Sequence, residues 1–290
     1  MDLFIQLTVS GLTNGAVYAL AALGFVLIYK SSDVINFAQG ELLLVGAYVT
    51  FFFVAQAGLA WPVGVLLALA VAVVLGVAVE RTVLRPLIGE PIISVIMVTI
   101  GLASVLRALV TAIWGPVPRS FPAFIPRDEV LILGAVVSAD RLWAIALSIL
   151  MLALFSLFFR LSNEGIAMRA VADDQQAAMS MGISIRRIFA LAWSIAAVTA
   201  TIGGMLLANI IGVGGNIAGL GLRVFPAVIL GGLDSIPGAV IGGVVIGLLE
   251  AWTGGYIGQG LNQIVPFIVL TLVLMVRPYG LFGQEIIERV

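Results

Sequence analysis

The polar residues that could do chemistry gather in two short segments of this 290-residue chain. The first covers residues 31–41 and contains Asp33, Asn36, Gln39 and Glu41 between two long apolar runs. Amide and carboxyl groups in such a setting are costly to bury and tend to face a cavity or a pathway. They are therefore candidates for binding the polar end of a small solute. An ordinary turn before a helix that starts at Gln39 would explain the same pattern.

The second polar segment, residues 160–187, predicts a short amphipathic helix. Asn163 and Glu164 offer a helix start, and Gly182 offers a stop. The segment is too short and too polar to span a membrane, so it could dock into a groove of a soluble partner. The alternative is a helix that lies on lipid headgroups. The adjacent acids Asp173 and Asp174 favour the partner, because the cytoplasmic leaflet is negatively charged.

Several reaction classes are excluded by residue types alone. The chain has no His and no Cys, which removes thiolate nucleophiles, Cys/His zinc sites and Ser-His-Asp triads. Asp173 and Asp174 without further oxygen ligands make a poor metal site. The stretch from Gly24 to Ser31 resembles a phosphate-binding loop, but Tyr29 replaces the second glycine. We expect no cofactor, no nucleotide site and no enzymatic activity in this chain.

Composition indicates the environment that positions these segments. Hydrophobic residues make up 62% of the chain, charged residues 10%, and the mean hydropathy is +1.21. A soluble fold of this size cannot cover so much apolar side chain, whereas a lipid bilayer can surround it. The formal net charge of −1 offers no basic surface for nucleic acid.

The hydropathy pattern predicts an all-α polytopic membrane protein with a single domain over residues 1–290. About seven full transmembrane helices are expected, together with a broken or re-entrant helical pair around Pro237, because a span needs about 20 apolar residues. The expected spans are Phe4–Tyr29, Leu42–Gln56, Pro62–Val79, Ile92–Trp114, Leu142–Phe159, Ile188–Ile211 and Val265–Val276, and the broken pair is Phe225–Leu233 with Gly238–Trp252. One ordinary kinked span is the alternative for that pair.

The basic residues of short loops predict the orientation. Threading the spans alternately places nine Lys and Arg residues on one side and four on the other, with Arg107 inside a span. The richer side should be cytoplasmic, so the N-terminus is expected outside and the C-terminus inside. Residues 160–187 are then cytoplasmic, and Gly115–Asp140 becomes an irregular external loop. Arg107 should be paired or extend toward the outer interface.

Small residues predict where helices pack closely. Gly11 and Gly15 lie four positions apart, a spacing that lets membrane helices approach each other. Asn14 between them is a further pathway candidate, or else a partner in an interhelical hydrogen bond. The other glycines expected to allow close packing are Gly231, Gly232, Gly238 and Gly242.

Four stretches together resemble a known family. They are residues 14–49, residues 165–183, residues 225–251 and the tail Arg-Pro-Tyr-Gly-Leu-Phe-Gly over residues 277–283. In this order and spacing they are similar to bacterial ABC permeases of the LivH type, in the branched-chain amino acid uptake family. Many relatives have His at the position of Gln39, so a protonation role there does not carry over to this chain.

The resemblance implies several partner subunits, each with a separate role. A second permease of the LivM type would share the membrane channel, two cytoplasmic ATP-binding subunits would drive it, and an extracytoplasmic amino-acid-binding protein would deliver substrate. The complex would lie in the bacterial inner membrane. The polar helix would be the coupling helix on an ATPase subunit. Its assigned residues are Glu164, Gly165, Arg169, Ala170, Asp173, Asp174, Ala177, Ala178 and Gly182.

Substrate and mechanism stay open in part. Leucine, isoleucine and valine, or related neutral amino acids, are the leading substrates that the resemblance implies. Urea or short amides are alternatives, because relatives of the family carry them. An ATP-independent secondary transporter or channel would also suit a broken helix and polar groups at membrane depth. The pathway candidates in all three cases are Asn14, Asn36, Gln39 and Glu41.

Overall fold

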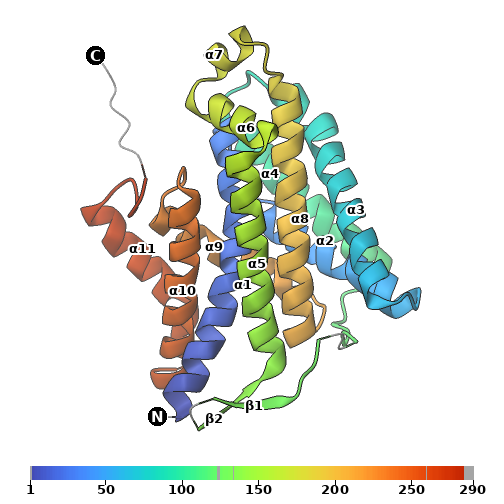
Figure 1. Ribbon diagram of the computed structural model, residues 1–290, viewed down its shortest axis with the longest axis vertical. Helices are drawn as coiled ribbons and strands as arrows, with labels where there is room; N and C mark the ends of the chain where they lie inside the picture. The colour runs from blue at the N-terminus through green and yellow to red at the C-terminus, as the bar shows by residue number, and fades with distance from the viewer. Residues whose placement is uncertain (1, 123–124, 133, 259, 284–290) are drawn as a thin grey trace.

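The computed structural model describes residues 2–122, 125–132, 134–258 and 260–283 and is almost entirely helical (Figure 1). Two π-helical turns, Phe52–Gln56 and Glu80–Leu84, directly follow the second and third helices of the chain. The helices are α1 (Asp2–Ser32), α2 (Gln39–Phe51), α3 (Trp61–Val79), α4 (Ile92–Trp114), α5 (Ala139–Leu161), α6 (Asn163–Asp173), α7 (Gln175–Ser180), α8 (Ile185–Ile211), α9 (Asn216–Gly231), α10 (Ile236–Tyr256) and α11 (Val265–Val276).

Seven helices within the described residues are long and apolar enough to cross a membrane, namely α1, α2, α3, α4, α5, α8 and α10. The predicted number of spans is therefore confirmed, but one assignment is wrong. The stretch Val265–Val276 was expected to span, yet α11 has 12 residues, or about 18 Å of helix. The seventh long helix is α10, with 21 residues. Residues 232–235 separate it from the shorter α9, so the predicted pair is two helices.

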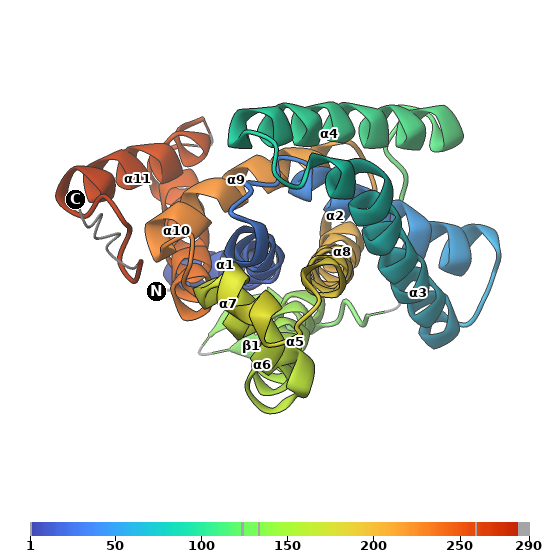
Figure 2. The same cartoon turned by 90° about the horizontal axis from the view of Figure 1, so that it is seen from above.

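Helices α1 and α8 form the centre of the bundle. In the most apolar 18-residue stretch of each helix, 89% of the residues of α1 and 78% of those of α8 are buried. The corresponding share is 17% in both α4 and α5. Figure 2 shows α1 between α10 and α8, with α4 and α5 on opposite sides of it. The surfaces of α4 and α5 therefore remain available to lipid or to other polypeptides.

Glycines allow α1 and α10 to approach each other along most of their length. A Cβ atom built on Gly15 would lie 2.8 Å from the Cα atom of Val244, and one on Gly11 would lie 2.8 Å from the Cα atom of Leu248. From the opposite side, Gly243 and Gly247 face the same stretch of α1. This is the close packing of small residues that brings membrane helices together where apolar side chains alone would not.

The loop between α4 and α5 contains a hairpin that the sequence reading missed. Strands β1 (Glu129–Ile132) and β2 (Ala135–Ser138) pair antiparallel, with Glu129 opposite Ser138. Gln6 of α1 donates a hydrogen bond from its Nε2 atom to the Val136 carbonyl oxygen, at 3.2 Å. The predicted irregular surface loop is thus partly regular. Its β-branched runs around Gly134 were the available signal.

Candidate functional site

Residues 33–38, between α1 and α2, are not helical although they are set among packed helices. Asp33 has a positive φ of 54°, which ends α1 and turns the chain back toward the bundle. Desolvation raises the pKa of the Asp33 carboxyl above its ordinary value. Thr99 of α4 holds the segment, because its Oγ1 atom accepts a hydrogen bond from the Phe37 backbone N–H at 3.3 Å.

This non-helical segment brings the start of α2 deep into the bundle. The Gln39 side chain lies against Gly24 and donates from Nε2 to the Ala21 carbonyl oxygen at 3.3 Å. Gly24 is eight residues before Ser32, the last residue of α1, which is about 12 Å along a helix. Irregular backbone at such depth is tolerated where protein buries it or where it lines a cavity. The helix start expected at Gln39 in the alternative reading is confirmed, and the segment before it is largely buried in the bundle.

Asn36 and Gln39 stabilise this segment and do not face a cavity. Asn36 is fully buried, donates from Nδ2 to the Gln39 Oε1 atom at 3.2 Å, and accepts at Oδ1 from the Ala38 backbone N–H at 3.0 Å. A satisfied buried network of this kind fixes one backbone conformation. The structure brings these two predicted pathway residues together, but their amide groups are already occupied by protein partners.

Glu41 instead lines a groove between α2, α4 and α9, which we call the Glu41 groove. Its volume is about 720 Å³. Apart from Glu41, its polar side chains are Ser104, Arg107 and Thr111, all on α4. The remaining wall is apolar or glycine: Phe37, Gly40, Ile100, Ala103, Ala108, Ala112, Ala218, Gly221 and Leu222.

Arg107 forms an ion pair with Glu41 across this groove. The expectation that Arg107 is paired is confirmed. The Glu41 side chain is only 7% exposed whereas that of Arg107 is 56% exposed, so the guanidinium is the open half of the pair. One anion and one cation beside apolar walls could contact the two charged ends of a zwitterion while leaving room for an aliphatic side chain.

Two polar groups elsewhere in the bundle do not join the Glu41 groove. Asn14 is ten residues before Gly24 in α1, about 15 Å along the helix, so the structure does not bring it to the other candidates. Glu250 of α10 is buried and accepts a hydrogen bond from the Tyr18 hydroxyl at 2.6 Å, with an Arg223 nitrogen 3.9 Å away. Arg223 lies within α9.

The predicted coupling helix is two helices. Helix α6 is capped by Ser162, whose Oγ atom accepts from the Gly165 backbone N–H at 2.9 Å. The chain then breaks at Asp174, which is extended, and its carboxylate accepts from the backbone N–H groups of Gln176 and Ala177 at 2.8 and 2.9 Å. The single helix from Glu164 to Gly182 is therefore wrong. Aspartate is a strong N-cap residue, which favours a new helix start at this point.

One face of the α6–α7 segment packs on the bundle and the other is open. Gly165, Met168 and Val171 are buried, as is Ala178 of α7. Arg169 lies over the Phe159 ring at 5.4 Å and donates to the Phe159 carbonyl oxygen, so it is not part of an outer polar face. Ala170 is half-buried and Glu164 forms an ion pair with Arg187. The exposed residues include Ile166, Asp173, Asp174, Ala177, Met179 and Met181.

The glycines between α9 and α10 lie where the two helices turn and touch. A Cβ atom on Gly242 would overlap the Ala227 carbonyl oxygen, and Gly231 and Gly238 would overlap each other's backbone. Gly232 has a φ of 111° and lies against Gly283.

Gly182 follows the end of α7 with a φ of 86°, and its N–H donates to the Met179 carbonyl oxygen at 2.9 Å.

Comparison with known proteins identifies relatives along the whole chain. Residues 7–274 match the family described as branched-chain amino acid transport system / permease component. The chain is 32% identical to the high-affinity branched-chain amino acid transport system permease protein LivH of Escherichia coli and to BraD of Pseudomonas aeruginosa, over 99% of this chain and 98% of each relative. It is 25% identical to a probable LivH of Methanocaldococcus jannaschii, over 92% and 88% of the two chains.

Proposed function

The chain belongs to the branched-chain amino acid transport permease family, and from that membership we propose that it is a permease subunit of an ATP-driven importer for leucine, isoleucine and valine. It would share the translocation pathway with a second permease, receive substrate from an extracytoplasmic binding protein, and be driven by two cytoplasmic ATP-binding subunits. Its location would be the bacterial inner membrane. The names of the relatives support the substrate class.

The observation that carries the proposal at the level of residues is the Glu41 groove. Arg107 would contact the carboxylate of the amino acid and Glu41 its ammonium group, while the apolar wall receives the aliphatic side chain. Such charge-assisted contacts are stronger than neutral ones. Because Arg107 is largely exposed, it can turn from Glu41 to the substrate carboxylate, and the substrate ammonium group would then pair with the buried Glu41. A weak, open site of this kind would also let substrate leave quickly.

The α6–α7 segment is the proposed contact with an ATP-binding subunit. Its outer face combines Asp173 with the exposed apolar side chains of Ile166, Met179 and Met181. Methionines suit such a surface, since their flexible side chains adapt to a partner. The inner face packs on Leu23, Leu27 and Phe155. A displacement of α6 by a partner would therefore be transmitted directly to α1 and α5, as a rigid-body tilt of packed helices.

Uptake of labelled leucine into proteoliposomes with trapped ATP tests the proposal. The preparation needs the complete complex and its binding protein. Glu41→Gln and Arg107→Gln should each lower initial uptake by about tenfold or more, since a lost charge-assisted contact is worth roughly 1.5–3 kcal/mol. Glu90→Gln, an exposed carboxylate before α4, is the matched control and should transport normally.

Three results would contradict different parts of the proposal. Normal uptake by both groove variants would remove the assignment of Glu41 and Arg107. Accumulation driven by an ion gradient without ATP would favour an autonomous carrier. Accumulation of urea or a short amide with no leucine uptake would change the substrate.

A further inference from the structure

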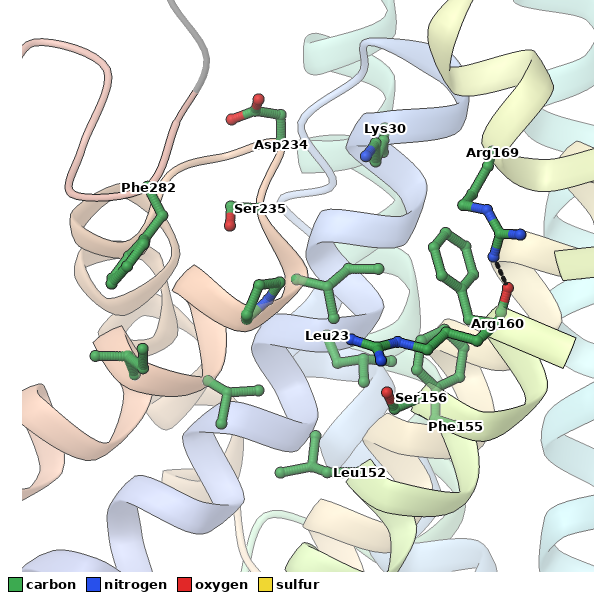
Figure 3. Close-up of a pocket in the computed structure, with 15 residues that line it drawn as sticks. Leu23, Lys30, Leu152, Phe155, Ser156, Arg160, Arg169, Asp234, Ser235 and Phe282 are labelled. Atoms are coloured by element: carbon green, nitrogen blue, oxygen red, sulfur yellow. Dashed lines mark hydrogen bonds between the residues drawn. The ribbon is translucent and has the colours of Figure 1, made fainter. Parts of the chain in front are cut away.

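A second groove lies on the opposite side of α1 from α2, beside α5, α6 and the α9–α10 turn (Figure 3). We call it the Arg160 groove. Its volume is about 690 Å³. Its deeper walls are mostly hydrocarbon side chains of α1, α5 and α10, beside the Ser156 hydroxyl. The main ones are Leu23, Leu152, Phe155, Val240 and Ile241. None of these groups can hydrogen bond to a polar ligand.

The mouth of the Arg160 groove is positively charged. Lys30 lies in the last turn of α1, Arg160 lies in the last turn of α5, and Arg169 projects from α6. Asp234 in the α9–α10 turn is the one carboxylate among the lining residues. Figure 3 shows the Arg160 guanidinium extending across the groove above Leu152. Across the described part of the chain, neither Lys30 nor Arg160 forms an ion pair. Among the described residues that line the groove, three cations therefore face one carboxylate.

The groove is reached from the side of the bundle that a bilayer would cover. Ile241 of α10, which lines the groove, is 41% exposed, and the apolar window of α5 is largely unburied. A soluble anion would satisfy the cations but leave the hydrocarbon wall empty. A molecule with an anionic head and an apolar tail would satisfy both at once.

We propose that the Arg160 groove binds an anionic phospholipid, with its phosphate among Lys30, Arg160 and Arg169 and one acyl chain along Leu23, Phe155 and Val240. Basic pockets between transmembrane helices bind such headgroups at the cytoplasmic side of membranes. The bound phosphate would connect α1, α5 and α6. Since α6 belongs to the proposed coupling segment, the lipid would hold that segment against the bundle. The binding itself does not depend on the transport proposal.

Lipid retention by the intact complex tests the site without measuring transport. The complex is purified from native membranes, washed with delipidating detergent and analysed by native mass spectrometry. Wild type should retain phosphatidylglycerol or cardiolipin in preference to phosphatidylethanolamine. The double variant Lys30→Gln/Arg160→Gln should lose retained anionic lipid by about tenfold or more, because each cation near a lipid surface contributes about 1 kcal/mol.

Two further variants separate charge from general damage. Arg81→Gln removes an exposed cation beside α3 that does not line the groove, and it should retain lipid as wild type does. Arg160→Lys keeps the charge and should also retain lipid. Adding phosphatidylglycerol to delipidated protein should raise the thermal midpoint of wild type and of both these variants, but not of the double variant.

Four outcomes would overturn the inference. They are equal retention of anionic lipid by the double variant, no preference of wild type for anionic over zwitterionic lipid, equal stabilisation of wild type by inorganic phosphate alone, and crosslinking of position 160 to a companion polypeptide in place of lipid. The third would assign a free-anion site and the fourth a protein contact.

Discussion

Replacing Gly15 by alanine tests whether α1 and α10 are held by backbone proximity. A Cβ atom at Gly15 would lie 2.8 Å from the Cα atom of Val244 and 3.0 Å from the Gly243 carbonyl oxygen. Carbon atoms pack at about 3.5 Å or more, so the helices must separate by about 0.7 Å. The atoms in the way belong to backbone, which cannot rotate aside. We therefore expect Gly15→Ala to be destabilising.

The separation also affects a buried hydrogen bond one turn away. The Tyr18 hydroxyl is 2.6 Å from the Glu250 carboxylate, and adding about 0.7 Å exceeds the usual O–H···O range of about 2.5–3.0 Å. Overpacking costs about 1–3 kcal/mol, and weakening the bond to a buried carboxylate adds to that. The gain from alanine in a helix is about 0.5–1 kcal/mol. The net effect should be a loss of about 1–3 kcal/mol.

Gly101→Ala is the matched control, because its Cβ atom would meet nothing within 4 Å. The higher helix propensity of alanine is then the one remaining effect, so this variant should be slightly more stable than wild type. The assay is the thermal midpoint of the purified complex in one detergent, read by loss of the monodisperse peak. The reasoning is refuted if Gly15→Ala is as stable as Gly101→Ala.

Four further predictions concern single side chains. Asp174→Ala removes the cap of α7, about 1 kcal/mol, so amide exchange at Gln176 and Ala177 should accelerate about fivefold by mass spectrometry. Asp173→Arg should weaken substrate-stimulated ATP hydrolysis while membrane insertion stays normal; unchanged stimulation would count against α6–α7 docking. Gly242→Leu should reduce the yield of assembled complex on size exclusion, because α9 leaves no room for the side chain. Asp33→Asn should be more stable than wild type at neutral pH. The raised pKa of Asp33 means that its ionised form is penalised in the fold, so wild type loses stability as pH rises through that pKa, and the difference should close below about pH 4 in a pH series of thermal midpoints.

The long apolar runs of the sequence predicted most of the fold. Hydropathy identified six of the seven long helices, because a continuous apolar run has few alternatives in lipid. It failed at α11, where an apolar run of sufficient hydropathy is shortened by the turn before Val265. The sequence pattern also did not predict the break between α6 and α7 at Asp174, because the capping role of Asp174 depends on the two backbone N–H groups that follow it.

The candidate site was predictable only in part. Sequence analysis could single out Glu41 and Arg107 as polar residues in apolar surroundings, but their pairing joins positions 66 residues apart. Asn36 and Gln39 carry the same signal as Glu41, yet their amides are used inside the protein. Which of these side chains faces a groove depends on the turn at Asp33, and neither residue type nor spacing encodes that direction.

The α1–α10 seam has a consequence for how the protein is made. Tyr18 and Glu250, which meet across it, are 232 positions apart. Helix α1 must therefore wait in the bilayer, with its glycine face uncovered, until α10 has been synthesised. Late arrival of a principal packing partner slows folding and exposes unfinished chains to misassembly. Truncation before α10 would leave α1 without the helix against which its glycines pack.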